Sequence, residues 1–126
     1  MHRYLIVGIL LCLSGYVSAH EWTPTYPELT RSHVEGILKT EMFLFNSRKD
    51  VGFCEINVWD SEWNSVSFAA ESRIISLDYL GRKKITIYIR ERDKDRVTYI
   101  CSKSKLVSEG VSKSSVSSRI CSKIKR

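Results

Sequence analysis

The sequence has few of the features that build helical, repeated or membrane-spanning proteins. No window shows sustained helical spacing of apolar residues, and no segment of the chain repeats another. Beyond residues 1–19, no apolar run approaches the roughly 20 residues that a transmembrane helix needs. Both prolines, Pro24 and Pro27, fall in an extended lead-in at 20–30. These absences disfavour helix bundles, solenoids and membrane spans.

Sequence motifs that carry catalysis are also missing. The chain has no Gly-x-Ser-x-Gly nucleophile elbow, no glycine-rich phosphate loop and no His-x-x-x-His pair. We therefore predict a protein that is not an enzyme and holds neither a cofactor nor a metal ion. One alternative is copper chemistry, because an N-terminal His20 with His33 is similar to the histidine brace of lytic polysaccharide monooxygenases. No axial tyrosine can be identified for such a site.

The N-terminus has the pattern of a secretory signal peptide. Two basic residues precede an apolar core at 4–13, and a small-residue cleavage pattern ends at Ala19. We expect 1–19 to be removed and 20–126 to form a single exported domain, in the periplasm or outside the cell.

Positive charge gathers toward the C-terminus of a chain whose formal net charge is +6 at pH 7. After Ser102 the only acidic residue is Glu109. The basic residues there are Lys103, Lys105, Lys113, Arg119, Lys123, Lys125 and Arg126. A solvated face explains such a run most simply, and a site for acidic groups is the alternative. Nucleic acid is not expected as a partner, because no aromatic platform is interleaved with these charges.

Short alternating runs predict strands. Ile85, Ile87 and Ile89 alternate with more polar residues, which is the period of two by which a strand buries one face. The predicted strands are 34–46, 52–60, 73–77, 84–90, 97–103 and 116–125. Six or seven short strands predict an all-β, immunoglobulin-like sandwich of two sheets. Parity predicts that its core includes Leu38, Met42, Leu44, Cys54, Ile56 and Val58.

Cysteine positions suggest a disulfide in an exported protein. Cys12 lies in the predicted signal peptide, which leaves three cysteines. Cys101 and Cys121 fall on the last two predicted strands, and a disulfide closing this loop would stabilise the fold by about 3 kcal/mol. The rival pair is Cys54 with Cys101, because 95–101 matches the Asp-x-x-x-Tyr-x-Cys signature of true immunoglobulin domains. We favour the first pair and keep the second as the alternative.

Several short segments, taken in order, resemble the N-terminal domain of periplasmic pilus chaperones. They are Leu29-Thr30-Arg31-Ser32-His33-Val34, Phe45-Asn46-Ser47, Ile56-Asn57-Val58-Trp59-Asp60, residues 74–81, Ile85-Thr86-Ile87-Tyr88-Ile89 and Asp95-Arg96-Val97-Thr98-Tyr99. The resemblance implies a one-domain version of such a chaperone. In that family the last strand of the domain pairs with an incompletely folded subunit and lends it a missing strand. One subgroup also joins its last two strands by a disulfide.

The same resemblance implies which residues meet the subunit. In the family, an arginine of the first strand and a lysine ending the last strand bind the subunit's terminal carboxylate. Lys123 matches the lysine, and His33 falls at the arginine, with Arg31 two residues earlier. The strand interface would comprise Val116, Ile120 and Ile124.

A different class of function fits the same fold. The last predicted strand places serines between its aliphatic residues, which would fill the pockets of a subunit weakly. An exported structural, adhesion or phage virion-associated module, with its last strand covered within the protein, is therefore the alternative to a chaperone-like binder.

Overall fold

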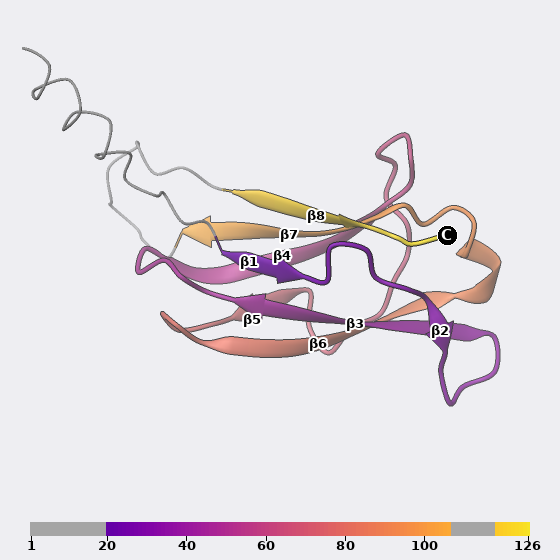
Figure 1. Cartoon of the computed structure of the whole chain (residues 1–126), viewed down its shortest axis with the longest axis horizontal. Helices are drawn as coiled ribbons and strands as arrows, with labels where there is room; N and C mark the ends of the chain where they lie inside the picture. The colour runs from indigo at the N-terminus through magenta and orange to yellow at the C-terminus, as the bar shows by residue number, and fades with distance from the viewer. Residues whose placement is uncertain (1–19, 107–117) are drawn as a thin grey trace, which may run out of the picture.

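Two antiparallel sheets make up the protein. The computed structural model describes residues 20–106 and 118–126, so the predicted signal peptide and Val116 lie outside the described residues. In chain order the strands are β1 (Glu21–Thr23), β2 (Thr30–Arg31), β3 (Ile37–Phe45), β4 (Val51–Trp59), β5 (Ile74–Ser76), β6 (Arg82–Arg90), β7 (Tyr99–Leu106) and β8 (Arg119–Lys123). A 3-10 turn, η2 (Glu91–Asp93), joins β6 to β7. The predicted all-β, two-sheet sandwich is confirmed (Figure 1).

The first sheet is organised around β3. β6 pairs with this strand along its whole length, from Ile37 opposite Arg90 to Phe45 opposite Arg82. β1 and β2 pair with the other side of β3, each along a different part of it. The second sheet has the order β5-β4-β7-β8, so β8 is an edge strand that pairs with β7. No helix within the described ranges is long and apolar enough to cross a membrane.

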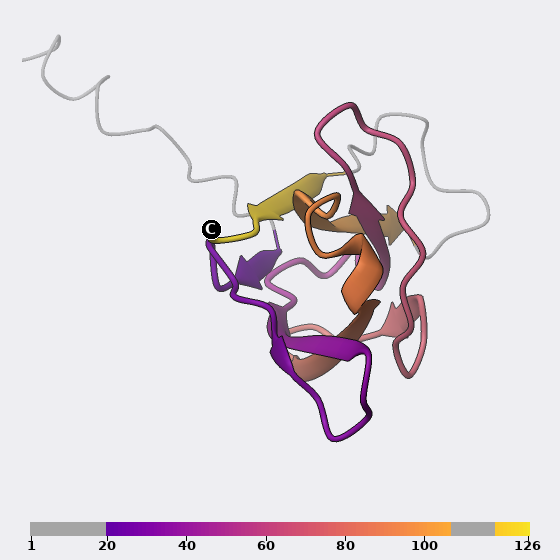
Figure 2. The same cartoon turned by 90° about the vertical axis from the view of Figure 1, so that its right-hand side faces the viewer.

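The N-terminal segment passes from one sheet to the other and back. After β1, the carbonyl oxygens of Thr25 and Pro27 accept hydrogen bonds from the backbone N–H groups of Lys123 and Lys125, at 3.1 and 2.9 Å. The chain then returns to the first sheet as β2. Figure 2 shows β1 and β8 on the same side of the sandwich. The predicted lead-in therefore covers part of the outer edge of β8.

The core lies between the two sheets and follows from alternation along the strands. Ile85, Ile87 and Ile89 of β6 are buried in one cluster with Ile100 of β7. Leu38, Met42, Leu44, Cys54, Ile56 and Val58 are buried as parity predicts. Burial of a large aliphatic side chain stabilises by roughly 1.5–3 kcal/mol. A slip of one residue in register would expose the whole inward row of a strand, so the pattern fixes the pairing.

Strand boundaries differ from the prediction in ways that have local causes. The strand predicted from 34 begins at Ile37, because Gly36 has a φ of 78° and closes the turn before it. β7 continues to Leu106, beyond the predicted end at 103. β1 and β2 are absent from the predicted strands because segments of two or three residues show no alternation to detect.

Candidate functional site

The outer edge of β8 is partly covered and partly open. Along β8 and the residues next to it, the backbone N–H and C=O groups of even-numbered residues face β7. The Ser118 oxygen accepts a hydrogen bond from the Ser104 N–H, and the Ile124 N–H donates to the Thr98 oxygen. The backbone groups of odd-numbered residues therefore point away from β7, as the bonds from the Lys123 and Lys125 N–H groups to the N-terminal segment show.

Two residues of β8 keep this outward direction without a strand that is hydrogen-bonded to them there, because the nearby β1 pairs with β3. In the described part of the chain, Arg119 and Cys121 have no backbone partner on the outer side of β8. Their outward N–H and C=O groups form an open edge, which we call the open half of β8 (Arg119–Cys121). An open edge presents unpaired donors and acceptors to which another strand can add.

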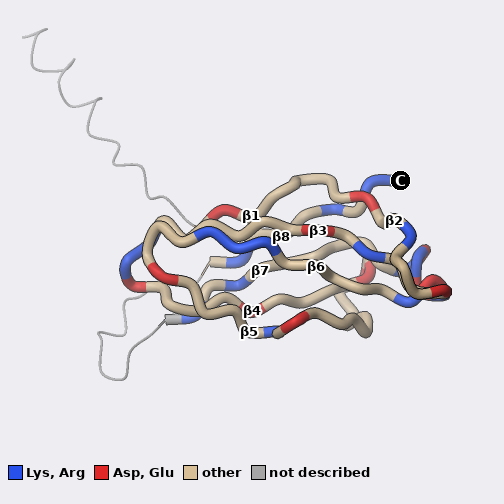
Figure 3. Tube along the Cα trace, turned by 90° about the horizontal axis from the view of Figure 1, so that it is seen from below, with Lys and Arg blue, Asp and Glu red and all other residues tan. Residues whose placement is uncertain are grey.

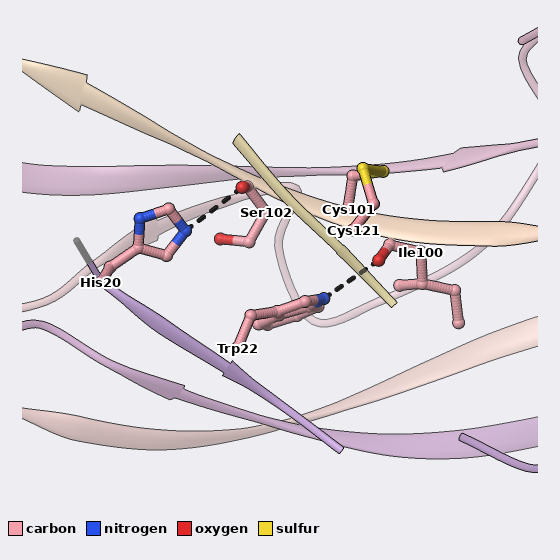
Figure 4. Close-up of a disulfide and its surroundings, with 6 residues drawn as sticks. All are labelled: His20, Trp22, Ile100, Cys101, Ser102 and Cys121. Atoms are coloured by element: carbon pink, nitrogen blue, oxygen red, sulfur yellow. Dashed lines mark hydrogen bonds between the residues drawn. A yellow bond between two sulfur atoms is a disulfide. The ribbon is translucent and has the colours of Figure 1, made fainter. Parts of the chain in front are cut away.

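A disulfide fixes this edge to the sheet. Cys101 and Cys121 lie directly opposite each other on β7 and β8, with their Cα atoms 4.1 Å apart, and are covalently joined (Figure 4). The favoured pairing is confirmed, and the rival pairing with Cys54 is wrong. Cys54 is a buried free thiol whose pKa burial raises, with the nearby Ser102 hydroxyl opposing the rise. Its side chain faces the core, whereas the disulfide lies on the opposite face of the sheet.

The side chains of β8 divide between the two faces of the sheet. Ile120 and Ser122 point inward, as does Ile124 just after the strand, and Arg119, Cys121 and Lys123 point outward. Ile124 is only 6% exposed and belongs to the core, while Ile120 packs against that core from a partly buried position. In the free chain the two isoleucines predicted to contact a partner therefore pack internally. Their role in partner binding stays a prediction.

The three residues predicted to bind a carboxylate lie on different sheets. Arg31 belongs to β2, where it pairs with Leu38, and His33 follows in the turn to β3. Lys123 ends β8 in the other sheet, and Thr25 is the residue of the N-terminal segment that bonds to it. Among the described residues no hydrogen bond or ion pair joins Lys123 to either of the other two. A shared carboxylate site therefore stays a prediction.

His20 and Trp22 tie the N-terminal segment to β7 from inside the sandwich. The Trp22 indole N–H donates to the Ile100 oxygen at 3.0 Å, and the His20 Nε2–H donates to the Ser102 oxygen at 3.2 Å. In this tautomer His20 Nδ1 accepts from the Ser118 hydroxyl, also at 3.2 Å. Figure 4 shows both rings pointing from the N-terminal segment toward β7. These bonds position β1 beside β8, and no local sequence pattern identifies them.

His20 is also one of the two histidines of the copper alternative. Its two ring nitrogens are occupied by protein partners in the described structure, and His33 lies in the turn between β2 and β3. Within residues 20–106 and 118–126, no group of three or more His, Cys, Asp or Glu side chains is arranged to hold a metal ion. The absence of a metal site and of catalysis remains a prediction.

We expect stability to fall with acidification because of His20. Burial lowers the pKa of His20 from its ordinary value of 6.5; the Ser102 carbonyl opposes this, and the charge of Arg48 adds to it. A base with a lowered native pKa binds its proton more readily in the unfolded chain, so stability present above pH 6.5 is lost as the pH falls through 6.5 toward the native pKa. The loss cannot exceed about 1.4 kcal/mol per pH unit for one proton.

The measurement is the free energy of unfolding of wild type and of His20→Gln at several pH values between 7.5 and 5. The glutamine amide keeps a donor for Ser102 but does not titrate. The difference between the two proteins should shrink as the pH falls through this range. A difference that does not vary with pH would contradict the buried, neutral histidine.

An aromatic and cationic cluster lies on the outer face beside the open half of β8. Trp63 comes from the turn after β4, where its φ is 64°, and its ring stacks on Tyr99 with centroids 4.5 Å apart and planes inclined by 2°. The Arg119 guanidinium lies 5.2 Å from the centre of the Trp63 ring. Asp60 orders the turn by accepting hydrogen bonds from the N–H groups of Glu62 and Asn64. In the sequence, only its place in the basic C-terminal run distinguishes Arg119.

Comparisons with known proteins support the fold alone. The chain matches no family model and no curated protein. Among solved structures it is similar to the crystal structure of the E. coli chaperone DraB, with a TM-score of 0.59, 14% sequence identity and 84% of this chain covered. The chain spans about half of that protein, 53% of its length. The resemblance to a chaperone sandwich is thus supported at the level of architecture.

Proposed function

We propose that this chain is an exported, chaperone-like protein that binds an assembling protein subunit by pairing a strand of that subunit with the open half of β8. The observation that carries the proposal is the open, outward-facing backbone of Arg119 and Cys121 on a fixed edge strand. The similarity of the fold to that of a chaperone supports it. The proposed action is binding, without catalysis.

The edge suits strand addition because it is held rigidly before the partner arrives. The disulfide and the ladder to β7 hold β8 in an extended conformation, and the N-terminal segment fixes its C-terminal end. Pre-ordering reduces the entropy that binding must offset. Main-chain hydrogen bonds then supply affinity, as in other strand-addition complexes.

Lys123 would lie where the added strand ends. Its N–H is already bonded to Thr25, so an added strand reaches it but does not pass it without displacing the N-terminal segment. In this proposal the Lys123 ammonium attracts a carboxylate at that end of the subunit. Arg31 and His33 lie on the other sheet and would contribute only to a partner that also contacts β2 and the following turn.

Export is part of the proposal. A disulfide between Cys101 and Cys121 is the usual product of an oxidising compartment such as the periplasm or the cell exterior. The predicted signal peptide would deliver the chain there.

A structural, adhesion or virion-associated module is the second candidate. It is favoured by the inward orientation of Ile120 and Ile124 and by the bonds that cover Lys123 and Lys125. In that case β8 would serve only its own sandwich.

Arg119→Pro is expected to abolish partner binding while the fold is retained. The Arg119 N–H points away from β7, so proline removes a donor of the open edge without removing a bond of the β7–β8 ladder. The measurement is quantitative co-purification of the partner from the native host with wild type and variant, together with the thermal midpoint of each protein. Hydrogen exchange should show slowed exchange at the Arg119 and Cys121 amides in the wild-type complex.

Two matched variants separate the loss of the outward N–H from the loss of charge and from the loss of stability. Arg119→Ala removes the charge but keeps the N–H, so it should retain strand pairing. Ile120→Pro removes an N–H that faces β7 and should lower stability by about 3 kcal/mol or more. If a folded Arg119→Pro protein recovers as much partner as wild type, the strand-addition proposal is wrong and the structural module is favoured.

A further inference from the structure

The outward surface around the open half of β8 carries an excess of positive charge. The described parts of β7 and β8, with the residues that follow β8, contain six basic residues and no acidic one: Lys103, Lys105, Arg119, Lys123, Lys125 and Arg126. Figure 3 shows basic segments on both strands. Lys105 pairs with Glu55 at 2.6 Å, and Lys125 with Glu28 at 3.0 Å.

The basic side chains nearest the open edge are not held in ion pairs in the described structure. Within the described ranges, Lys103, Arg119 and Lys123 form no ion pair. Lys103 lies directly opposite Arg119 in the ladder, so two like charges face each other across the strands. Such a cross-strand pair is destabilising. Glu55 of β4 lies opposite Lys103 on its other side and offsets part of the charge of that lysine. An acidic partner would relieve the repulsion that remains at Arg119.

The geometry of strand addition places a partner's side chains in this field. A residue opposite Arg119 on an added antiparallel strand has its Cβ about 4.5–5.5 Å from that of Arg119, and the residue two positions along faces the same side. Carboxylates at alternate positions would therefore lie beside the row formed by Arg119, Cys121 and Lys123. The inward-facing residues between them would lie beside Ile120 and Ser122.

Arg119 is held in place for such an interaction. Its guanidinium lies against the Trp63 ring, which in turn stacks on Tyr99. Trp63 is 46% exposed, so part of this cluster is open to a partner. Trp, Tyr and Arg are the residue types most often found at the energetic centres of protein interfaces. A positioned guanidinium loses less entropy on binding a carboxylate than a freely moving side chain.

We propose that the segment that adds to the open half of β8 is acidic, with carboxylates at alternating positions on the face it shares with Arg119 and Lys123. This inference rests on the proposed function and names the chemistry of its partner. A second copy of this chain is a poor occupant, because pairing β8 with β8 would bring Arg119 and Lys123 against like charges.

The test uses three synthetic ten-residue peptides of threonine alternating with glutamate, glutamine or lysine. Binding to the disulfide-bonded protein is followed by amide NMR shifts, which give both the affinity and the location. We expect the glutamate peptide to shift the Arg119 and Cys121 amides and to bind about tenfold more tightly than the glutamine peptide. The lysine peptide should bind most weakly. The glutamate preference should shrink between 0.05 and 0.5 M salt.

Variants assign the preference to Arg119. Arg119→Gln should reduce the glutamate preference to about threefold and leave the affinity for the glutamine peptide unchanged. Lys83→Gln is the matched control, because Lys83 is an exposed cation of β6 in the other sheet, and it should leave the preference intact. Arg119→Pro should abolish binding of the glutamate and glutamine peptides alike.

The outcomes separate the two proposals. Equal binding of the glutamate and glutamine peptides at β8, lost for both in Arg119→Pro, overturns the acidic partner and retains strand addition. No shift of the Arg119 and Cys121 amides with any peptide overturns strand addition itself. Unchanged binding of the glutamate peptide to Arg119→Pro also overturns the inference, because charge would then act without pairing. Dimerisation through β8 in sedimentation without peptide would assign the edge to a second copy instead.

Discussion

Removal of the Cys101–Cys121 disulfide is expected to lower the free energy of unfolding by about 3 kcal/mol. The two cysteines are 20 positions apart, and the cross-link excludes unfolded conformations in which the ends of that loop are separated. Domains of ordinary stability unfold with only about 5–15 kcal/mol, so the loss is a large part of the total. The loss of stability should be largest in β8, because it is a five-residue edge strand that pairs with β7.

The measurement compares guanidinium denaturation of wild type and of the double variant Cys101→Ser, Cys121→Ser. The denaturation midpoint of wild type in reductant should equal that of the double variant. Reductant should not change the midpoint of the double variant. Alkylation of the unreduced, denatured wild-type domain should label Cys54 and spare the other two cysteines of 20–126. Equal midpoints for oxidised and reduced wild type would contradict a stabilising role.

This disulfide also governs the proposed function. Without it, β8 can separate from β7 more readily, and the open half of the strand would no longer be ordered before the partner arrives. The double variant should therefore bind the glutamate peptide more weakly than wild type, even under conditions in which both proteins are folded.

The sequence predicts the parts of the fold that repeat with a period of two. The alternation of Ile85, Ile87 and Ile89 locates β6 and its buried face, and the positions of Cys101 and Cys121 locate two neighbouring strands. These signals are local, since each depends on side chains a few residues apart or on a covalent bond. Lys123 is likewise found on the last strand, where the sequence places it.

The rest depends on backbone contacts between distant segments. Nothing in Thr25 or Pro27 indicates that their carbonyl oxygens accept hydrogen bonds from Lys123 and Lys125, because carbonyl groups are common to all residues. The open half of β8 begins where the hydrogen bonds with the N-terminal segment end. For the same reason, the bonds from His20 and Trp22 to β7 have no sequence signature.

For the aliphatic residues at the end of the chain, the family resemblance and the alternation of residues give different expectations. The resemblance to pilus chaperones assigns Ile120 and Ile124 to a partner, whereas alternation alone places two aliphatic residues of the same parity on a buried face. In the structure that face is turned to the core, and the outward row is basic. A partner that adds to the edge of β8 therefore meets Arg119 and Lys123 on its outer side.

Ile124→Ala is expected to lower the free energy of unfolding by about 2–4 kcal/mol, because Ile124 is 6% exposed and packs in the core cluster. Two other isoleucines calibrate the effect in the same assay. Ile120→Ala, from a partly buried position, should cost about 1 kcal/mol, and Ile74→Ala, at 52% exposure, should stay within about 0.5 kcal/mol of wild type. The measurement is equilibrium denaturation of all three variants under oxidising conditions.

The same variants decide what Ile124 does for binding. If it serves the core, Ile124→Ala should bind the glutamate peptide as wild type does at temperatures where both are folded, since the open edge and Arg119 are untouched. A variant with wild-type stability and lost binding would mean that Ile124 turns outward to meet a partner. β8 would then have to leave its place on β7, where the Ile124 N–H bonds to Thr98 and the disulfide joins the two strands. Because the disulfide resists that separation, we expect the loss of stability and not the loss of binding.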